Sequence, residues 1–269
     1  MFQIMQLELK TAFRQKTIYL FSLLWIVILM FLFILQSSVP GVLSYTNTTS
    51  TIMNLVFILI PLITLINAAL SLSGEKENGQ FKLIGTYPLS NTSYVLGKLA
   101  GQAIVQWVTF TFSYGISLAI ATLVGLTLDI KWIFFLYSFA IFLTYLFLLM
   151  GILIGLFSKN RWSALSIAVF AWFFLIMFWP TFFISILNLL PYAVGDWIVK
   201  AAIFLNPAEF LRLVYVSQLG GGSIFGQNYD SLVSTFSTGL GWMFLGYYLI
   251  VVTVLSVFAG DFLLFKRRR

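Results

Sequence analysis

Six long apolar segments, separated by shorter polar ones, limit most strongly what this chain can fold into. Each contains 18 or more mostly apolar residues, the length that a helix needs to cross the hydrocarbon core of a bilayer. Backbone groups in lipid must be satisfied within the structure, and polar–apolar alternation is missing, so helices are predicted rather than a barrel. We therefore expect an all-α polytopic membrane protein with one transmembrane domain over residues 1–269. Its six transmembrane helices are expected at residues 18–35, 52–73, 94–126, 132–157, 162–189 and 240–265.

The composition excludes a soluble globular protein. Of the residues, 61% are hydrophobic and only 9% are charged, whereas soluble domains carry about 25% charged residues. The formal net charge of +7 does not indicate nucleic-acid binding, because the basic residues lie beside the predicted spans. We expect this chain to lie in the lipid bilayer and to bind no nucleic acid.

The positions of the basic residues predict the orientation in the membrane. Twelve of the fifteen precede the first span, follow the sixth, or lie between the second and third or the fourth and fifth spans. Only Lys131, Lys200 and Arg212 fall on the other side. Since positive charge collects on the cytoplasmic side, both termini are expected in the cytoplasm, with the protein in the bacterial inner membrane.

Residues 2–16 precede the first span and predict a helix that lies on the cytoplasmic leaflet. One helical face carries apolar residues and the charges lie opposite, the pattern of an interfacial helix. The alternative is a simple extension of the first span, whose apolar run is too long for a cleaved signal peptide. The apolar face consists of Phe2, Met5, Leu9, Ala12 and Phe13.

The segment between the fifth and sixth spans, about residues 190–239, is long enough to need structure of its own. Asn206, Pro207 and Glu209 have the pattern of a helix start: an N-cap, a proline in the first turn, and a glutamate that can reach back to the cap. Glycines 220–222 are expected to end this helix. We predict a short amphipathic helix on the outer face that can dip into the membrane.

Several chemistries are excluded by what the sequence lacks. Cysteine and histidine are absent, which removes disulfides and histidine- or cysteine-based catalysis. The central turns of the first five spans hold no ionisable residue, which argues against ion-coupled transport. No lysine is expected to be buried in a span, which argues against a Ser-Lys catalytic pair. The only Gly-Lys pair, Gly97-Lys98, lacks the upstream glycine of a phosphate-binding loop. We predict no catalytic or metal-binding residue, and any ATP must be hydrolysed on another chain.

Polar residues in the second and third spans mark a candidate pathway across the membrane. Polar side chains inside spans face protein or water more often than lipid. They can also form hydrogen bonds between helices, so both interpretations stay open. The candidate residues are Asn54, Asn67, Gln102, Gln106, Thr109 and Ser113.

Two glycine pairs allow helices to approach each other closely. Such small-residue patterns serve either packing within one chain or a dimer face. The pairs are Gly97 with Gly101, and Gly151 with Gly155.

Three short sequences around the second polar interruption resemble the first cytoplasmic loop of type-2 ABC transporter (ABC-2) permeases. They are Glu75-Lys76-Glu77-Asn78-Gly79, Thr86-Tyr87-Pro88-Leu89-Ser90 and Tyr94-Val95-Leu96-Gly97-Lys98. The segment 205–213 resembles the outer-loop motif of the branch that serves nitrous oxide reductase maturation, carried here by Asn206, Pro207, Glu209 and Arg212. Gln80 and Asn91 depart from the usual Thr and Arg, which leaves the cargo open.

The resemblance implies a homodimer of six-helix subunits joined to two copies of an ABC ATP-binding subunit. ATP and Mg would be held by that partner, with no cofactor in this chain. The region 74–91 would form a coupling helix that docks into a groove of the ATPase, with Glu75 and Glu77 meeting basic groups and apolar residues as anchors; the alternative is a solvated loop. The candidate coupling residues are Glu75, Lys76, Glu77, Gly79, Phe81, Leu83 and Pro88.

The function that follows is a permease subunit and not an enzyme. The resemblance to the maturation branch implies transport of a sulfur species, less readily copper, for assembly of the copper centre of nitrous oxide reductase. One alternative is an ABC-2 exporter of lipid, peptide or drug. Another is a membrane scaffold that uses segment 190–239 to hold an extracytoplasmic helper protein.

Overall fold

The computed structural model describes residues 2–14, 16–37, 47–80, 90–125, 129–187, 189 and 192–268, and within these ranges the regular structure is helical. Short 3₁₀ turns follow α10 at Gly222–Phe225 (η2) and Gln227–Tyr229 (η3). A π-helical segment, Phe173–Phe178 (η1), joins α7 to α8. The α-helices are α1 (Phe2–Arg14), α2 (Lys16–Ser37), α3 (Asn47–Glu77), α5 (Asn91–Leu123), α6 (Ile130–Phe157), α7 (Arg161–Trp172), α8 (Trp179–Leu187), α9 (Tyr192–Leu205), α10 (Pro207–Gln218), α11 (Asp230–Phe236) and α12 (Leu240–Arg268).

Within the described part of the chain, five helical segments are long and apolar enough to cross a membrane by themselves. They are Ser50–Glu77, Asn91–Leu123, Ile130–Phe157, Arg161–Ile186 and Leu240–Phe265. A sixth is counted when α1 and α2, which meet at an angle of 71°, are taken together. The expected all-α multi-span fold is confirmed.

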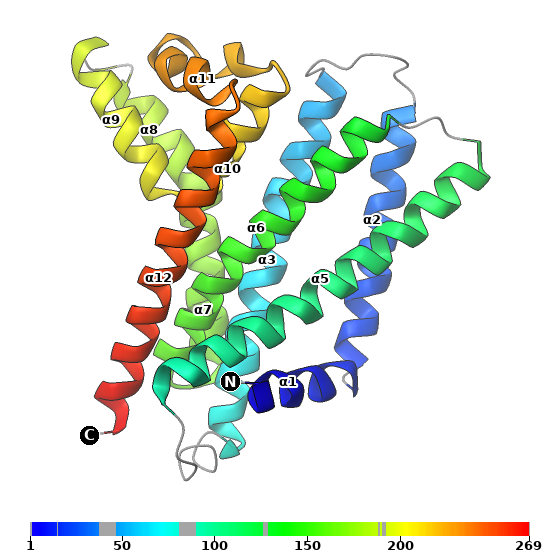
Figure 1. The fold of residues 1–269 in the computed structure, drawn as a ribbon, viewed down its shortest axis with the longest axis vertical. Coiled ribbons are helices and arrows are strands. Elements are labelled where there is room, and N and C mark those ends of the chain that lie inside the picture. Colours follow the sequence, from blue (N-terminus) through cyan, green and yellow to red (C-terminus); the bar gives the residue numbers. More distant parts are fainter. Residues whose placement is uncertain are drawn as a thin grey trace.

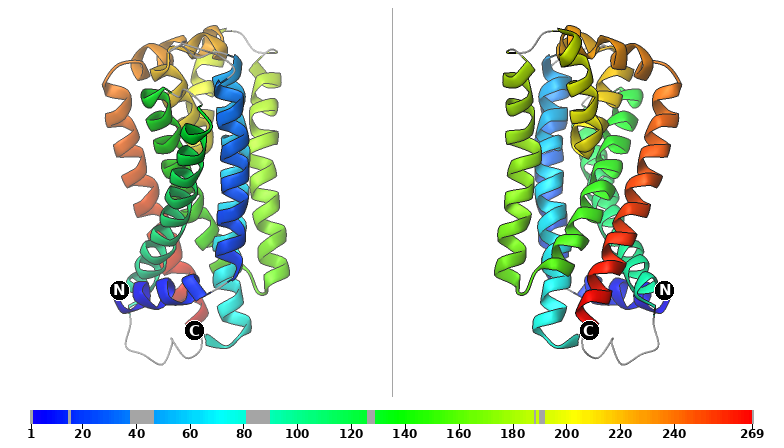
Figure 2. Two further views of the ribbon diagram at one scale, coloured as in Figure 1. Left: turned by 90° about the vertical axis from the view of Figure 1, so that its right-hand side faces the viewer. Right: turned by 90° about the vertical axis from the view of Figure 1, so that its left-hand side faces the viewer.

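The spans form one bundle with α3 and α6 at its centre (Figure 1). Helix α5 crosses the bundle obliquely and carries α2 and α1 on one side, while α12 packs on α5 and α6. Both chain termini lie at the same end, together with α1 and the last turn of α3 (Figure 2). We call this the basal end, and the opposite end, formed by α9, α10 and α11, the apical end.

Local sequence explains where several helices begin. Ser90 accepts a hydrogen bond from the Ser93 backbone N–H (3.2 Å) at the start of α5. Asp129 accepts one from the Lys131 N–H (2.7 Å) at the start of α6. Asn160 caps α7 in the same manner. These side chains satisfy N–H groups that would otherwise lack a partner in the first turn.

Helices α3 and α6 approach each other closely because glycines lie between them. A Cβ added at Gly151 would lie 2.6 Å from the Ala68 Cβ, and one added at Gly155 would lie 2.7 Å from the Leu72 Cβ. No side chain fits at such a distance without moving the helices apart. Of the two interpretations of this glycine pair, packing within the chain is the one seen here.

Helix α1 lies across the basal end against α5, rather than continuing the line of α2 (Figure 1). Phe2 and Phe13 are exposed, whereas Ile4 and Glu8 face the bundle and are buried. Glu8 therefore lies on the face that packs against the bundle, whereas the sequence indicates only that the charges of this helix lie opposite its apolar face. The reason is a buried partner on α5, described below, which helical periodicity cannot reveal.

The apical segment begins α10 where the sequence predicts. Asn206 is the N-cap and accepts from the Ala208 N–H (3.0 Å), and Pro207 occupies the first turn. The reciprocal bond from Glu209 to the cap is not formed, because the Asn206 N–H already donates to the carbonyl of Ala202, 3.2 Å away at the end of α9. Gly220, with a φ of +76°, follows the helix, a conformation that glycine adopts without strain.

The predicted amphipathic character of α10 is wrong. Ten of its residues, including Phe210 and Tyr215, are buried, and they pack on α6, α9, α11 and α12. The surrounding helices cover its polar side as well as its apolar side. A helix with so few exposed positions belongs to the core of the apical end and not to a membrane surface.

Candidate functional site

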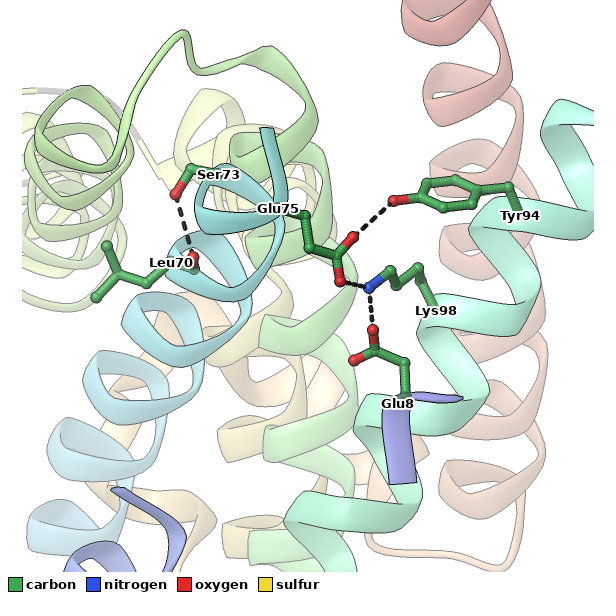
Figure 3. A network of polar contacts seen from close by, with 6 residues as sticks. All are labelled: Glu8, Leu70, Ser73, Glu75, Tyr94 and Lys98. Carbon is green, nitrogen blue, oxygen red and sulfur yellow. Dashed lines mark hydrogen bonds and ion pairs between the residues drawn. The ribbon is translucent and has the colours of Figure 1, made fainter. Parts of the chain in front are cut away.

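A buried ion network joins three helices at the basal end (Figure 3). Lys98, on the second turn of α5, forms ion pairs with Glu8 of α1 and Glu75 of α3, and its side chain is fully buried. The Tyr94 hydroxyl donates to the other Glu75 carboxylate oxygen at 3.1 Å. The expectation that no lysine is buried in a span is therefore wrong, because α1 covers this part of α5.

Local structure explains why these groups meet. Tyr94 and Lys98 are four residues apart on α5, so they lie on the same helical face in successive turns. Glu75 lies in the last turn of α3, and its carboxylate points toward that face (Figure 3). Gly101, one turn further along α5, lets α1 approach, since a Cβ there would lie 2.6 Å from the Glu8 Cβ.

The electrostatics of the network are unbalanced, because two carboxylates share one ammonium group. Burial raises the pKa of the Glu8 carboxyl; Lys98 opposes this and Glu75 adds to it. Buried ion pairs gain little net stability, yet removal of one partner leaves an uncompensated charge and is strongly destabilising. The network therefore holds α1, α3 and α5 in one arrangement.

The next two residues of α3 bind two further helices. Lys76 donates to the carbonyl oxygens of Gly155, Leu156 and Ser158 at 2.5, 2.6 and 3.0 Å, at the end of α6. A lysine at this place complements the negative end of the helix dipole. Glu77 accepts from the Arg161 N–H (2.8 Å) and pairs with its side chain (3.2 Å) at the start of α7.

The last turn of α3 is thus bonded directly to α5, α6 and α7, and through Lys98 to α1, immediately before the predicted coupling segment. Gly79 follows, with a φ of +73°, and among the described residues no atom lies within 4 Å of the place where its Cβ would be. Glu75 is already paired inside the chain, whereas the sequence suggested that it meets a partner. The coupling residues Phe81, Leu83 and Pro88 lie outside the described residues, so their role stays a prediction.

Four of the candidate pathway residues line one cavity between α1, α2, α3, α5 and α6. These are Asn67, Gln102, Gln106 and Thr109, and the cavity, of about 120 Å³, also contacts Thr64 and Thr144. We call it the central cavity. Gln102 is buried, and neither of its amide atoms has a hydrogen-bond partner among the described residues. Such a group is rare in folded proteins and needs an explanation.

The other two pathway candidates lie elsewhere. Ser113 is fully buried and bonds to the Ser22 hydroxyl (2.9 Å) and carbonyl (3.0 Å), so it joins α5 to α2. Asn54 lines a second cavity, of about 260 Å³, at the apical end. The candidate pathway is therefore split between a central cavity, an apical cavity and a helix contact.

The apical cavity also contacts two residues of the outer-loop motif. Glu209 and Arg212, one turn apart on α10, form an ion pair with atoms 2.9 Å apart and both line the cavity. Asn206 and Pro207 are not on its wall; they start the helix that presents the pair. Two residues of the motif thus start α10, and the other two place an ion pair on the cavity wall.

Sequence reasoning missed Glu8 and Arg161 as functional candidates and treated Lys98 only as part of a motif. The spacing of Tyr94 and Lys98 on one helical face, next to a charged amino-terminal helix, was the available signal. Glu8 and Lys98 are ninety residues apart, and no local pattern connects them.

Comparisons with known proteins agree with this architecture. Residues 2–269 match the family described as ABC-2 family transporter protein. The chain is 29% identical over 232 residues to the probable ABC transporter permease protein NosY of Stutzerimonas stutzeri, covering 81% of this chain and 82% of that protein. It is 26% identical over 219 residues to the protein of the same description from Pseudomonas aeruginosa, covering 78% and 79%. Because the family match extends over residues 2–269, the chain belongs to the ABC-2 family of transporter proteins. It is similar to NosY permeases.

Proposed function

We propose that this chain is the membrane-spanning subunit of an ATP-driven ABC transporter and couples ATP hydrolysis on a separate chain to translocation. Family membership implies an ABC ATP-binding partner. We further propose two copies of that partner, which hold ATP and Mg, on a homodimer of this chain. The basal end would face the cytoplasm at the bacterial inner membrane, since most basic residues lie there.

The observation that carries the coupling proposal is the junction at the last turn of α3. Glu75, Lys76 and Glu77 bond this turn to α5, α6 and α7, and Lys98 links Glu75 to Glu8 of α1. A force applied by the ATPase to residues 78–90 would reach four helices through short polar contacts rather than through a loose loop. Closure of the ATPases would then shift the bundle between two states.

The central cavity is the proposed cargo site. Its polar residues are uncharged amides and hydroxyls, and the buried Gln102 amide has no hydrogen-bond partner among the described residues. For cargo we propose a sulfur species used to build the copper centre of nitrous oxide reductase, on the basis of the similarity to NosY permeases. Copper itself is less suitable, because the chain has no cysteine or histidine to ligate it.

The test is to express the chain with the ATPase encoded beside it and to measure ATP hydrolysis by the purified complex in lipid. Phe81→Asp and Leu83→Asp should prevent co-purification, since a charged group cannot occupy an apolar docking pocket. Leu123→Asp, an exposed leucine at the far end of α5, is the matched control and should leave the complex intact. Unchanged co-purification of both basal variants would contradict the coupling assignment.

The same preparation tests the alternatives. If no ATPase binds the unaltered chain, a scaffold that holds an extracytoplasmic partner through the apical end becomes the better explanation. If the ATPase binds and is stimulated by a lipid, peptide or drug, but not by a sulfur donor such as sulfide or persulfide, the chain is an exporter of another cargo.

A further inference from the structure

The apical cavity is separate from the proposed cargo site. Its volume is about 260 Å³, and among the described residues none lines both this cavity and the central one. Its walls come from α3, α8, α9 and α10 and from the 3₁₀ turns that follow α10. They combine the charged pair Glu209 and Arg212 with the aromatic rings of Trp179, Phe225 and Tyr229.

The charged pair is only partly satisfied. One Glu209 oxygen bonds to Arg212 at 2.9 Å, but the other carboxylate oxygen and the Arg212 Nε have no hydrogen-bond partner among the described residues. Glu209 is 8% exposed, so bulk water does not simply solvate it. A buried acceptor and donor left open are destabilising by themselves, and an apolar pair would pack as well.

The pair is also held in place before any ligand arrives. The Asn206 amide donates to the Leu175 carbonyl (2.7 Å) and its oxygen caps α10, which positions Glu209. The Arg212 guanidinium lies over the Phe57 and Phe225 rings, 5.2 and 5.4 Å from their centroids. Side chains fixed in this way lose little freedom when a ligand binds.

We propose that the apical cavity binds a small zwitterion that carries an ammonium group and an acidic oxyanion, as a free amino acid or a phosphoethanolamine headgroup does. The ammonium would donate to the Glu209 carboxylate and lie beside the aromatic rings, which attract cations. The oxyanion would accept from the Arg212 guanidinium, whose side chain is 27% exposed. Because the pair itself has no net charge, a guest with a single charge would remain uncompensated.

This inference needs only the apical fold and does not depend on coupling to an ATPase. Binding is measured on the purified chain in nanodiscs of phosphatidylglycerol, a lipid without an ammonium group, by calorimetry and by ligand-observed NMR. Glycine and L-serine are the zwitterionic probes. Acetate and methylammonium carry one charge each and are the matched controls. Glycine and serine should bind, and the single-charge probes should bind at least about tenfold more weakly.

Variants locate the site without relying on the ion pair alone. Arg212→Lys keeps the charge but removes the planar guanidinium donors, and should weaken glycine binding at least about tenfold. Asn54→Leu fills the cavity from α3 without touching the pair, and should abolish binding while the thermal unfolding midpoint is retained. Gln106→Leu, in the central cavity, should leave glycine binding unchanged.

Two results would overturn the proposal. Acetate binding as tightly as glycine would make the cavity a simple anion site. Absence of glycine and serine binding at about 10 mM, with the unaltered chain folded, would make the pair purely structural. Loss of glycine binding in nanodiscs that contain phosphatidylethanolamine identifies the lipid headgroup as the source of the zwitterion, and retention identifies a free molecule.

Discussion

Lys98 of α5 and Glu8 of α1 form a buried ion pair that fixes the amino-terminal helix across the basal end of the bundle (Figure 3). Glu75 of α3 shares the same ammonium group. The three residues come from helices that enter the bundle from different directions. Their contact makes the end of α3, where the predicted coupling segment begins, part of a rigid junction.

Replacement of Lys98 by methionine should strongly destabilise the fold. Two buried carboxylates would lose their counter-charge, a change that typically costs about 3–5 kcal/mol. Thermal unfolding of the purified chain in detergent measures it. Lys10→Met, on the exposed side of α1, is the control and should stay close to the unaltered protein. A Lys98→Met protein as stable as Lys10→Met would show that the network contributes nothing.

The triple change Lys98→Met, Glu8→Gln and Glu75→Gln should recover much of that loss. It removes all three charges together, so no buried charge remains unpaired. The same unfolding measurement compares it with Lys98→Met alone. Equal stability of the single and triple variants would indicate that lost packing, rather than charge, is responsible.

The free energy of unfolding should fall as pH rises, because the buried Glu8 carboxyl loses its proton. Burial raises its pKa above the ordinary 4.5, so the folded state holds the proton more tightly than the unfolded state. The contribution of protonated Glu8 to the free energy of unfolding is then complete below about pH 4.5. It is lost as pH rises through the raised pKa of Glu8 in the folded state. Lys98 and Glu75 are the titratable groups that face it, and the Tyr94 hydroxyl, bonded to Glu75, lies close enough to interact with its charge.

Glu8→Gln isolates that effect. The amide keeps the size of the side chain and cannot titrate, so the fall in the unfolding midpoint between acid and neutral pH should become smaller. The measurement is a series of melting curves from about pH 4.5 to about pH 8, with both proteins in the same detergent. Parallel curves for the two proteins would exclude Glu8 as the titrating group.

Gly155→Ala should separate α3 from α6. The added Cβ would lie 2.7 Å from the Leu72 Cβ and 3.0 Å from the Ala69 carbonyl oxygen, and overpacking of this kind typically costs about 1–3 kcal/mol. Gly246→Ala on α12 would meet no atom of the described residues within 4 Å and should be neutral or slightly stabilising, since alanine favours helix. A Gly155→Ala protein with unchanged stability would contradict the close packing.

Gln102→Leu should separate stability from transport. Its buried amide has no partner among the described residues, so an apolar replacement of similar size should be tolerated or stabilising. Cargo-stimulated ATP hydrolysis by the complex should fall nevertheless, because the central cavity loses its free amide. Thr122→Val, at an exposed position of α5, is the control. Full stimulated activity of Gln102→Leu would remove this cavity from the pathway.

Some features of the fold could be predicted because they depend on neighbouring residues only. The spans follow from the length of their apolar runs. The start of α10 follows from Asn206 and Pro207, since a cap acts within one turn. The family resemblance also rested on short motifs in order, and the comparison over residues 2–269 confirms it.

Other features depended on contacts that no local pattern contains. The sequence by itself determined a multi-span helical membrane protein, because hydrophobic length and capping are local properties. Only the tertiary structure decided that Glu8 and Lys98 pair and that α10 is buried on all sides. It also decided that Asn54 lies in a different cavity from Asn67. Each of these is a matter of which helix covers which face, and that is set by packing between segments distant in the chain.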